Sequence, residues 1–167
     1  MDKIRSVTFW IAVLSAIPSV TSAQDTTVGY AFGAPGFASC GCSESITTLH
    51  AGGGGEVRMA DTIGIGADVG YLGPFESFSE GFGMLSVNGS YYLPASGRNR
   101  RVRPFVTTGY TMAFSDGTAN MWNLGGGVDY WTSKRVGVRF EVRDHIWVDE
   151  GTAHFWGPRI GIVVRGR

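Results

Sequence analysis

Three histidines, His50, His145 and His154, are the residues of this 167-residue chain best suited to acid–base chemistry. His145 follows Asp144 in "RDHIW", so a base and an orienting carboxylate are adjacent in the sequence. A hydrolase of this type also needs a nucleophilic serine within hydrogen-bond reach of the histidine. No serine lies in a recognisable signature such as GxSxG. We therefore favour histidines that hydrogen-bond to their neighbours, and we predict that the protein is not an enzyme.

Two further motifs could hold a metal or a phosphate. The only cysteines are Cys40 and Cys42, in "SCGCSE". They supply two ligands, even with His50 nearby, whereas a zinc site takes three or four, so we favour a disulfide or loop staple. The run "GGGG" at 52–55 lies inside a strand pattern with no helix after it, which argues against a phosphate-binding loop. The sequence thus predicts no metal and no cofactor.

Ion pairing is the chemistry indicated by residues 135–148, "RVGVRFEVRDHIWV". Its valines and Phe140 alternate with charged side chains, which is the period of a strand with one apolar and one charged face. Unpaired charges in a low-dielectric interior are very costly, so charges on an inward face must pair. The candidate charge network consists of Glu56, Arg58, Asp68, Asp129, Arg139, Glu141, Arg143 and Arg159.

The same alternation recurs along the chain, broken by turn-rich clusters, with no sustained helical period. It predicts eight strands, at residues 26–34, 46–59, 62–72, 82–93, 102–114, 120–131, 135–148 and 155–164. Strands of about ten residues suit a tilted membrane strand better than the shorter strands of globular sheets. We predict an all-β fold, an eight-stranded antiparallel up-and-down transmembrane β-barrel, whose closure leaves no unpaired backbone edge.

Residues 1–23 have the pattern of a secretory signal peptide: Lys3 and Arg5, then an apolar run, then the small Ala23. We predict its cleavage, which leaves one barrel domain of residues 24–167; a retained N-terminal anchor helix is the alternative. Charged residues make up 17% of the chain, below the roughly 25% of an ordinary soluble domain. The formal net charge is +0, which argues against nucleic acid as a partner.

Charges also divide between the predicted connections. The odd connections are acidic, with Glu44, Glu76, Glu80, Asp116, Asp149 and Glu150. Among the even ones, "SGRNRRVR" and "TSKR" are basic, and "RMAD" is mixed. Odd and even connections of an up-and-down barrel lie at opposite rims. The pattern therefore predicts one acidic and one basic rim.

The composition of the two strand faces indicates which face points outward. The polar faces are rich in glycine and nearly free of lysine, which suits a narrow interior better than a water-exposed sheet. Aromatic residues near both strand ends are typical of membrane interfaces. Those expected at the interfaces are Tyr71, Phe114, Trp122, Trp147, Phe155 and Trp156 at the acidic rim, and Tyr91, Tyr130 and Trp131 at the basic rim. Asp144 breaks the pattern, because its parity places it towards lipid unless a bulge turns it inward.

With its signal peptide, its eight alternating strands and stretches such as "VRPFVTTGY" and "WNLGGGVDYW", the chain resembles the small eight-stranded outer-membrane barrels of the OmpA/OmpX type. The resemblance covers essentially all of residues 24–167. It implies a monomer in the outer membrane of a Gram-negative-type bacterium, with outer-membrane lipid and the outer-membrane assembly machinery as partners. The chain departs from such barrels at its end, "VVRGR", where they usually have an aromatic residue.

The resulting hypothesis is an integral outer-membrane barrel with a structural or surface-interaction role. Because side chains fill the interior of an eight-stranded barrel, we favour a lumen plugged by the charge network over a narrow solute channel. A soluble exported barrel that binds a small apolar ligand and a barrel-type lipid hydrolase are the competing hypotheses. The surface partner is not evident from the sequence.

Overall fold

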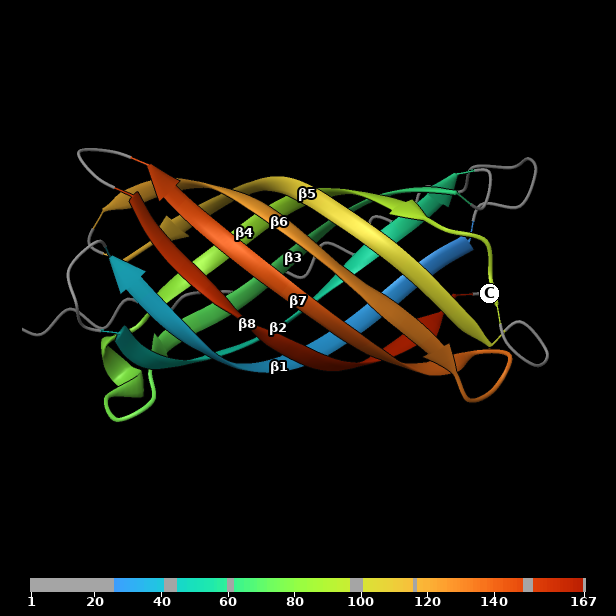
Figure 1. The fold of residues 1–167 in the computed structure, drawn as a ribbon, viewed down its shortest axis with the longest axis horizontal. Coiled ribbons are helices and arrows are strands. Elements are labelled where there is room, and N and C mark those ends of the chain that lie inside the picture. The colour runs from blue at the N-terminus through green and yellow to red at the C-terminus, as the bar shows by residue number, and fades with distance from the viewer. Residues whose placement is uncertain are drawn as a thin grey trace, which may run out of the picture.

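The computed structural model describes residues 26–40, 45–59, 62–96, 101–115, 117–148 and 152–166. Eight strands follow one another in these residues and close into a single barrel (Figure 1). They are β1 (Thr26–Cys40), β2 (Ser45–Met59), β3 (Ile63–Pro74), β4 (Phe82–Tyr92), β5 (Val102–Phe114), β6 (Thr118–Trp131), β7 (Val136–Val148) and β8 (Thr152–Arg165). The predicted eight-stranded up-and-down barrel is confirmed. The predicted signal peptide, residues 1–23, lies outside the described residues.

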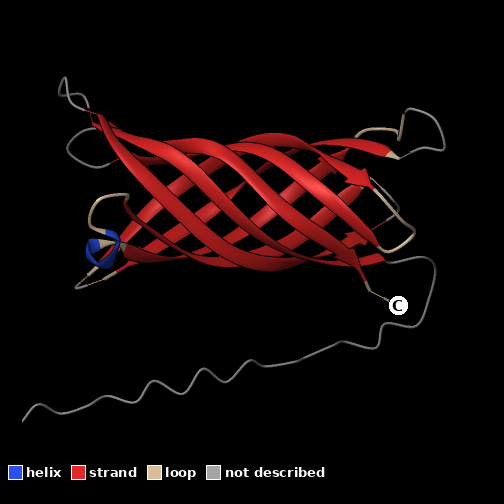
Figure 2. Cartoon of the chain, turned by 90° about the horizontal axis from the view of Figure 1, so that it is seen from below, coloured by secondary structure: helices blue, strands red, loops and turns tan. Residues whose placement is uncertain are grey.

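Every strand is antiparallel to its neighbours, and β1 also pairs with β8, which closes the sheet (Figure 2). Closure gives each strand two hydrogen-bonding partners, so the wall of the barrel has no free edge. A short 3₁₀ helix, η1 (Phe78–Glu80), lies in the connection from β3 to β4. Within the described segments, no helix has the length and apolar character needed to cross a membrane.

The first strand is longer than predicted. Pro35 and Gly36 indicate a turn, which predicts a strand that ends at residue 34. Instead β1 continues to Cys40, and Pro35 pairs with Leu49 of β2. The pairing of β1 with β8 continues as far as Gly33 and resumes at Phe37, so Pro35 lies in the gap between the two paired stretches. Proline is tolerated here because the strand keeps its register with one neighbour across the residue that cannot donate a hydrogen bond.

Among the described residues, the connections at the two ends of the barrel carry charges of opposite sign. We call the end where β1 begins and β8 ends the terminal rim, and the opposite end the distal rim. Glu76 and Glu80 follow β3 at the distal rim, whereas Lys134 and Arg135 lie in the β6–β7 turn at the terminal rim. These four residues follow the predicted division. Glu44, Asp116, Asp149 and Glu150 lie outside the described residues.

Side chains alternate between the lumen and the outer wall along each strand. In β4, Leu85 and Val87 are 41% and 57% exposed, whereas Ser86 and Asn88 are 1% and 5% exposed. The other strands repeat this pattern, with large apolar side chains outside and polar or charged ones inside. The barrel is thus the reverse of a water-soluble one, in which the apolar face would be buried.

Glycines on the inward face leave room for the polar side chains. A Cβ atom at Gly64 would lie 2.5 Å from the carboxylate carbon of Glu56, and one at Gly70 would lie 2.5 Å from Nε2 of His50. On the outer face at Gly89, the nearest atom to an added Cβ is 4.0 Å away. The inward glycines are therefore required by close approach, as the composition of the polar faces predicted.

The predicted aromatic girdles are only partly correct. Phe114, Trp122 and Trp156 are exposed on the outer wall near the distal rim, and Tyr91 and Tyr130 are exposed nearer the terminal rim. Trp147, Phe155 and Trp131 instead share the inward phase of their strands. The girdle prediction included these three residues because they lie near strand ends. Their phase in the alternation instead directs them into the two mouths of the barrel.

Candidate functional site

The eight residues of the predicted charge network all lie in the lumen, and each is at most 5% exposed. They come from five strands: Glu56 and Arg58 from β2, Asp68 from β3, Asp129 from β6, Arg139, Glu141 and Arg143 from β7, and Arg159 from β8. The tilt and closure of the strands bring together residues that are far apart in the sequence. They form two layers along the barrel axis, each with two arginines and two carboxylates.

The terminal layer consists of Glu56, Arg58, Asp129 and Arg139. Asp129 accepts hydrogen bonds from both arginines, from Arg58 Nη2 to Oδ2 at 2.6 Å and from Arg139 Nε to Oδ1 at 2.7 Å. Arg58 Nε also donates to Glu56 Oε1 at 3.0 Å. The phenol of Tyr92 donates to Glu56 Oε1 at 2.6 Å and accepts from Arg139 Nη2 at 3.0 Å. All four charged side chains in this layer are therefore both paired and hydrogen-bonded.

The central layer consists of Asp68, Glu141, Arg143 and Arg159. Arg143 Nη1 donates to Asp68 Oδ2 at 3.0 Å, and its Nε donates to Glu141. Asn88 Nδ2 adds a second donor to Asp68 Oδ2, at 2.8 Å. With two positive and two negative side chains, this layer is formally neutral, like the terminal one.

Arg159 is held differently from the other three arginines. Its Nη2 lies 3.6 Å from Asp68 Oδ1 and its Nη1 lies 3.6 Å from Glu141 Oε1, distances that are too long for good hydrogen bonds. Its three guanidinium nitrogens have no hydrogen-bond partner in the described residues. The guanidinium lies over the ring of Phe32, 3.5 Å from the centroid. Arg159 is therefore paired by charge and by stacking on an aromatic face, without directed hydrogen bonds.

Uncharged polar side chains continue the network towards the distal rim. Asn123 Nδ2 donates to Asn88 Oδ1 at 2.9 Å and to Thr111 Oγ1 at 3.0 Å. Thr111 Oγ1 in turn lies 3.2 Å from Nδ1 of His145. A cavity of about 20 Å³ beside His50, His145 and Arg159 has room for about one water molecule. The filled part of the lumen thus runs beyond the two charged layers.

Apolar side chains close the column of polar residues at both ends. The distal cluster consists of Leu72, Met84, Ala113 and Met121, with Phe82 and Phe155 packed against it. At the terminal end, Val28, Trp131 and Val163 form a second cluster. The guanidinium of Arg165 lies 3.7 Å from the centre of the Trp131 ring. The charged layers therefore lie between two apolar clusters.

The histidines do not form the hydrolase arrangement considered from the sequence. Asp144 and His145 are adjacent along β7 and so point to opposite sides of the wall. His145 is inside the barrel, whereas Asp144 is on the outer face, where its Oδ2 lies 2.7 Å from Nδ1 of His154. The register through Asp144 runs from Leu124 to Trp156 without a bulge, so Asp144 is not turned inward. Adjacency in the sequence therefore did not bring together a base and its carboxylate.

The remaining sequence candidates give no site. Among the described residues, no group of three or more His, Cys, Asp or Glu side chains could hold a metal ion. Cys42 and the side chain of Cys40 lie outside the described residues, so their predicted disulfide stays a prediction.

Sequence reasoning missed several neutral members of the network. Tyr92 bonds to both Glu56 and Arg139, and Asn88 and Asn123 connect the layers. Tyr92 has the same phase along β4 as Ser86, Asn88 and Ser90, so the alternation already placed it inward. Assigning inward positions from charge alone overlooks polar residues on strands without charges.

Solved structures provide the comparison with known proteins, since no family model and no curated protein matches the sequence. The N-terminal β-barrel domain of Pseudomonas aeruginosa OprF has 18% identity and a TM-score of 0.64, over 86% of this chain and 100% of that chain. Neisserial surface protein A has 15% identity and a TM-score of 0.64, over 83% and 96%. Ail, the attachment invasion locus protein of Yersinia pestis, has 11% identity and a TM-score of 0.51, over 85% and 98%. At these identities the likeness is one of fold, that of the small eight-stranded outer-membrane barrels.

Proposed function

We propose that this protein is an integral outer-membrane protein with a structural or surface-interaction role. The proposal rests on its fold, which the small eight-stranded outer-membrane barrels share. Its lumen is closed by the charge network and the apolar clusters at its two ends. Residues 1–23 direct its export and are removed. The proposal includes no enzymatic activity, because none of the described histidines lies beside both a carboxylate and a nucleophilic serine.

One observation carries the membrane location: the inverted distribution of side chains. On the outer wall, Val106, Val142 and Ile160 are 52%, 54% and 56% exposed. Soluble monomers rarely expose contiguous apolar surfaces larger than a few hundred Å². An apolar band around the whole barrel is stable against acyl chains, and the closed backbone ladder needs no water.

The orientation follows from the even number of strands. Both ends of the barrel domain lie at the terminal rim, and an exported chain arrives from the periplasm. We place the terminal rim on the periplasmic side and the distal rim, with Glu76 and Glu80, on the outside. The distal connections would then carry any recognition of a surface partner.

Spin labelling tests the membrane location directly. Cysteines are placed at Val106, Val142 and Ser133, one at a time, in a chain with Cys40→Ser and Cys42→Ser. Labels at the two valines should collide with oxygen dissolved in the bilayer. The label at Ser133, in an exposed turn, should collide with a water-soluble nickel chelate. Collision of the valine labels with the chelate instead would exclude a membrane barrel and support the soluble exported alternative.

A narrow channel is the second candidate, and the lack of directed hydrogen bonds to the buried Arg159 side chain favours it. A side chain without directed hydrogen bonds can exchange partners at lower cost than one held by several. Single-channel recording in planar bilayers separates the two possibilities. A closed lumen predicts no large, stable conductance. A stable conductance that changes ion selectivity on Arg159→Met would support the channel and overturn the closed lumen.

A further inference from the structure

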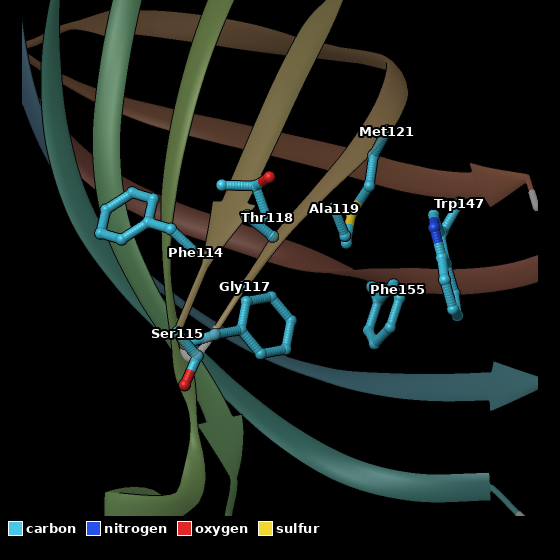
Figure 3. Close-up of a pocket in the computed structure, with 10 residues that line it drawn as sticks. Phe114, Ser115, Gly117, Thr118, Ala119, Met121, Trp147 and Phe155 are labelled. Carbon is cyan, nitrogen blue, oxygen red and sulfur yellow. The ribbon is translucent and has the colours of Figure 1, made fainter.

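The distal mouth of the barrel contains an apolar cavity that the charge network does not use. It has a volume of about 360 Å³, and ten of the described residues line it, including Phe82, Ala119, Met121, Trp147 and Phe155. Figure 3 shows Ala119, Met121, Trp147 and Phe155 around this space, with Gly117 of the β5–β6 turn beside them. The cavity therefore lies at the open end of the lumen, above the distal cluster.

The described lining residues come from five strands, β4 to β8, so the closed barrel is needed to assemble them. Phe82 begins β4, Met121 and Ala119 lie near the start of β6, Trp147 lies near the end of β7, and Phe155 near the start of β8. All five share the inward phase of their strands. These five residues belong to the lumen, whereas Phe114, at the edge of the site, belongs to the outer wall.

None of the described lining residues is charged, and the only polar side chains among those described, besides the indole of Trp147, are the hydroxyls of Ser115 and Thr118. The rings of Phe82 and Phe155 meet edge to face, with centroids 5.9 Å apart. Met121 is only 3% exposed and lies in the floor. A methionine floor is adaptable and makes favourable contacts with aromatic rings. Such a lining recognises an apolar ring and would leave an ionic group unpaired.

The volume sets the size of the ligand. An apolar cavity of about 150 Å³ holds a benzene molecule, and ligand pockets generally fall between about 300 and 1,000 Å³. A cavity of 360 Å³ therefore admits a flat molecule of two fused rings with some freedom. The mouths of β-barrels are recurrent ligand sites for the same geometric reason.

We propose that the distal mouth is a binding site for a small, uncharged aromatic molecule of about two rings. Trp147, which is 37% exposed, lies at the entrance, and Met121 contacts the bound ring from below. The charged layers beneath the distal cluster make the site a dead end. Binding therefore gives the barrel a receptor site for an apolar compound, without passage through the lumen.

Methionine methyl NMR with naphthalene as the probe tests this site. The protein is labelled at the methionine methyl groups and placed in lipid nanodiscs. Met121 and Met84 report on the mouth, while Met59 and Met112, with the outward phase of β2 and β5, report on partition of the probe into lipid. We expect saturable ring-current shifts at Met121, smaller ones at Met84, and none that saturate at Met59 or Met112.

Two variants and a second probe complete the test. Ala119→Phe fills the cavity and should abolish the saturable shifts, whereas Ala67→Phe places the same ring on the outer wall and should preserve them. Naphthalene-1-sulfonate should bind at least tenfold more weakly. Shifts that rise linearly at all four methionines, or that survive Ala119→Phe, would overturn the site. Equal binding of the sulfonate would overturn the ligand class. These readouts do not depend on conductance. They assume the membrane location of the proposed function, which spin labelling tests separately, so failure of the site and failure of that location are distinguishable.

Discussion

The terminal and central layers contain the same charges but are bonded in different ways. In the terminal layer, Asp129 receives both arginines at 2.6 and 2.7 Å, and Tyr92 connects the remaining carboxylate to Arg139. In the central layer, Arg159 stands 3.6 Å from both carboxylates and stacks on Phe32. The free-energy cost of desolvating a buried charge is offset only when the ion pair has good geometry and its hydrogen bonds are satisfied. Formal neutrality is thus common to both layers, whereas only the terminal one gives both of its arginines directed hydrogen bonds.

The largest effect is expected from Asp129→Asn. The change removes the negative charge shared by Arg58 and Arg139 and leaves excess positive charge in the buried terminal layer. Breaking a buried pair in this way typically costs about 3–5 kcal/mol. Equilibrium unfolding in urea, followed by tryptophan fluorescence in lipid vesicles, measures the loss.

The matched control for that change is Asp144→Asn on the outer face. Its partner His154 is 42% exposed, so the same loss of charge should cost less than about 1 kcal/mol. Equal losses in the two variants would contradict the idea that burial and shared bonding make the charge of Asp129 costly to remove.

A smaller effect is expected where a methyl group enters the crowded lumen. Gly64→Ala places a Cβ against the carboxylate of Glu56, which Arg58 and Tyr92 hold in place. Overpacking of this kind typically costs about 1–3 kcal/mol. Gly89→Ala adds the same methyl group to the outer wall in open space and should be nearly neutral. A similar cost for both variants in urea unfolding would show that strand propensity, and not the lumen, limits these positions.

Arg159→Met should destabilise the barrel by about 3 kcal/mol, the lower end of the cost of breaking a buried pair, because it too leaves one excess charge in its layer. The variant loses no directed hydrogen bond and keeps an apolar side chain against Phe32. Arg143→Met, in the same layer, removes hydrogen bonds to both Asp68 and Glu141 and serves as the comparison. If Arg159→Met proves the more costly of the two in the same unfolding assay, the lack of directed hydrogen bonds to Arg159 does not make it the weaker-held arginine.

The smallest effect is expected at the outer-wall pair. His154→Gln retains a polar side chain and should change the free energy of unfolding by less than about 0.5 kcal/mol, as partly exposed pairs usually do. A loss of several kcal/mol would mean that Asp144 and His154 are buried by lipid strongly enough to behave like the lumen pairs. Measurement in vesicles and again in detergent micelles would reveal that dependence on the surrounding lipid.

Much of this architecture was predictable because a strand has a period of two. The alternation of Val138, Arg139, Phe140 and Glu141 determines that these residues point to opposite faces, wherever the strand lies. The glycine-rich polar faces indicated which face is inside. For this reason the eight strands and the inward position of all eight charged residues followed from local patterns.

Partner choice did not follow from those patterns. Asp129 and Arg58 are far apart in the sequence, and only the register and closure of the barrel bring them to 2.6 Å. The same stagger brings Asp144 of β7 beside His154 of β8, and the ring of Phe82 of β4 against Phe155 of β8 in the distal mouth. Alternation specifies a direction for each side chain but no height along the barrel. Height is set by the stagger between strands, which is a property of the whole closed sheet.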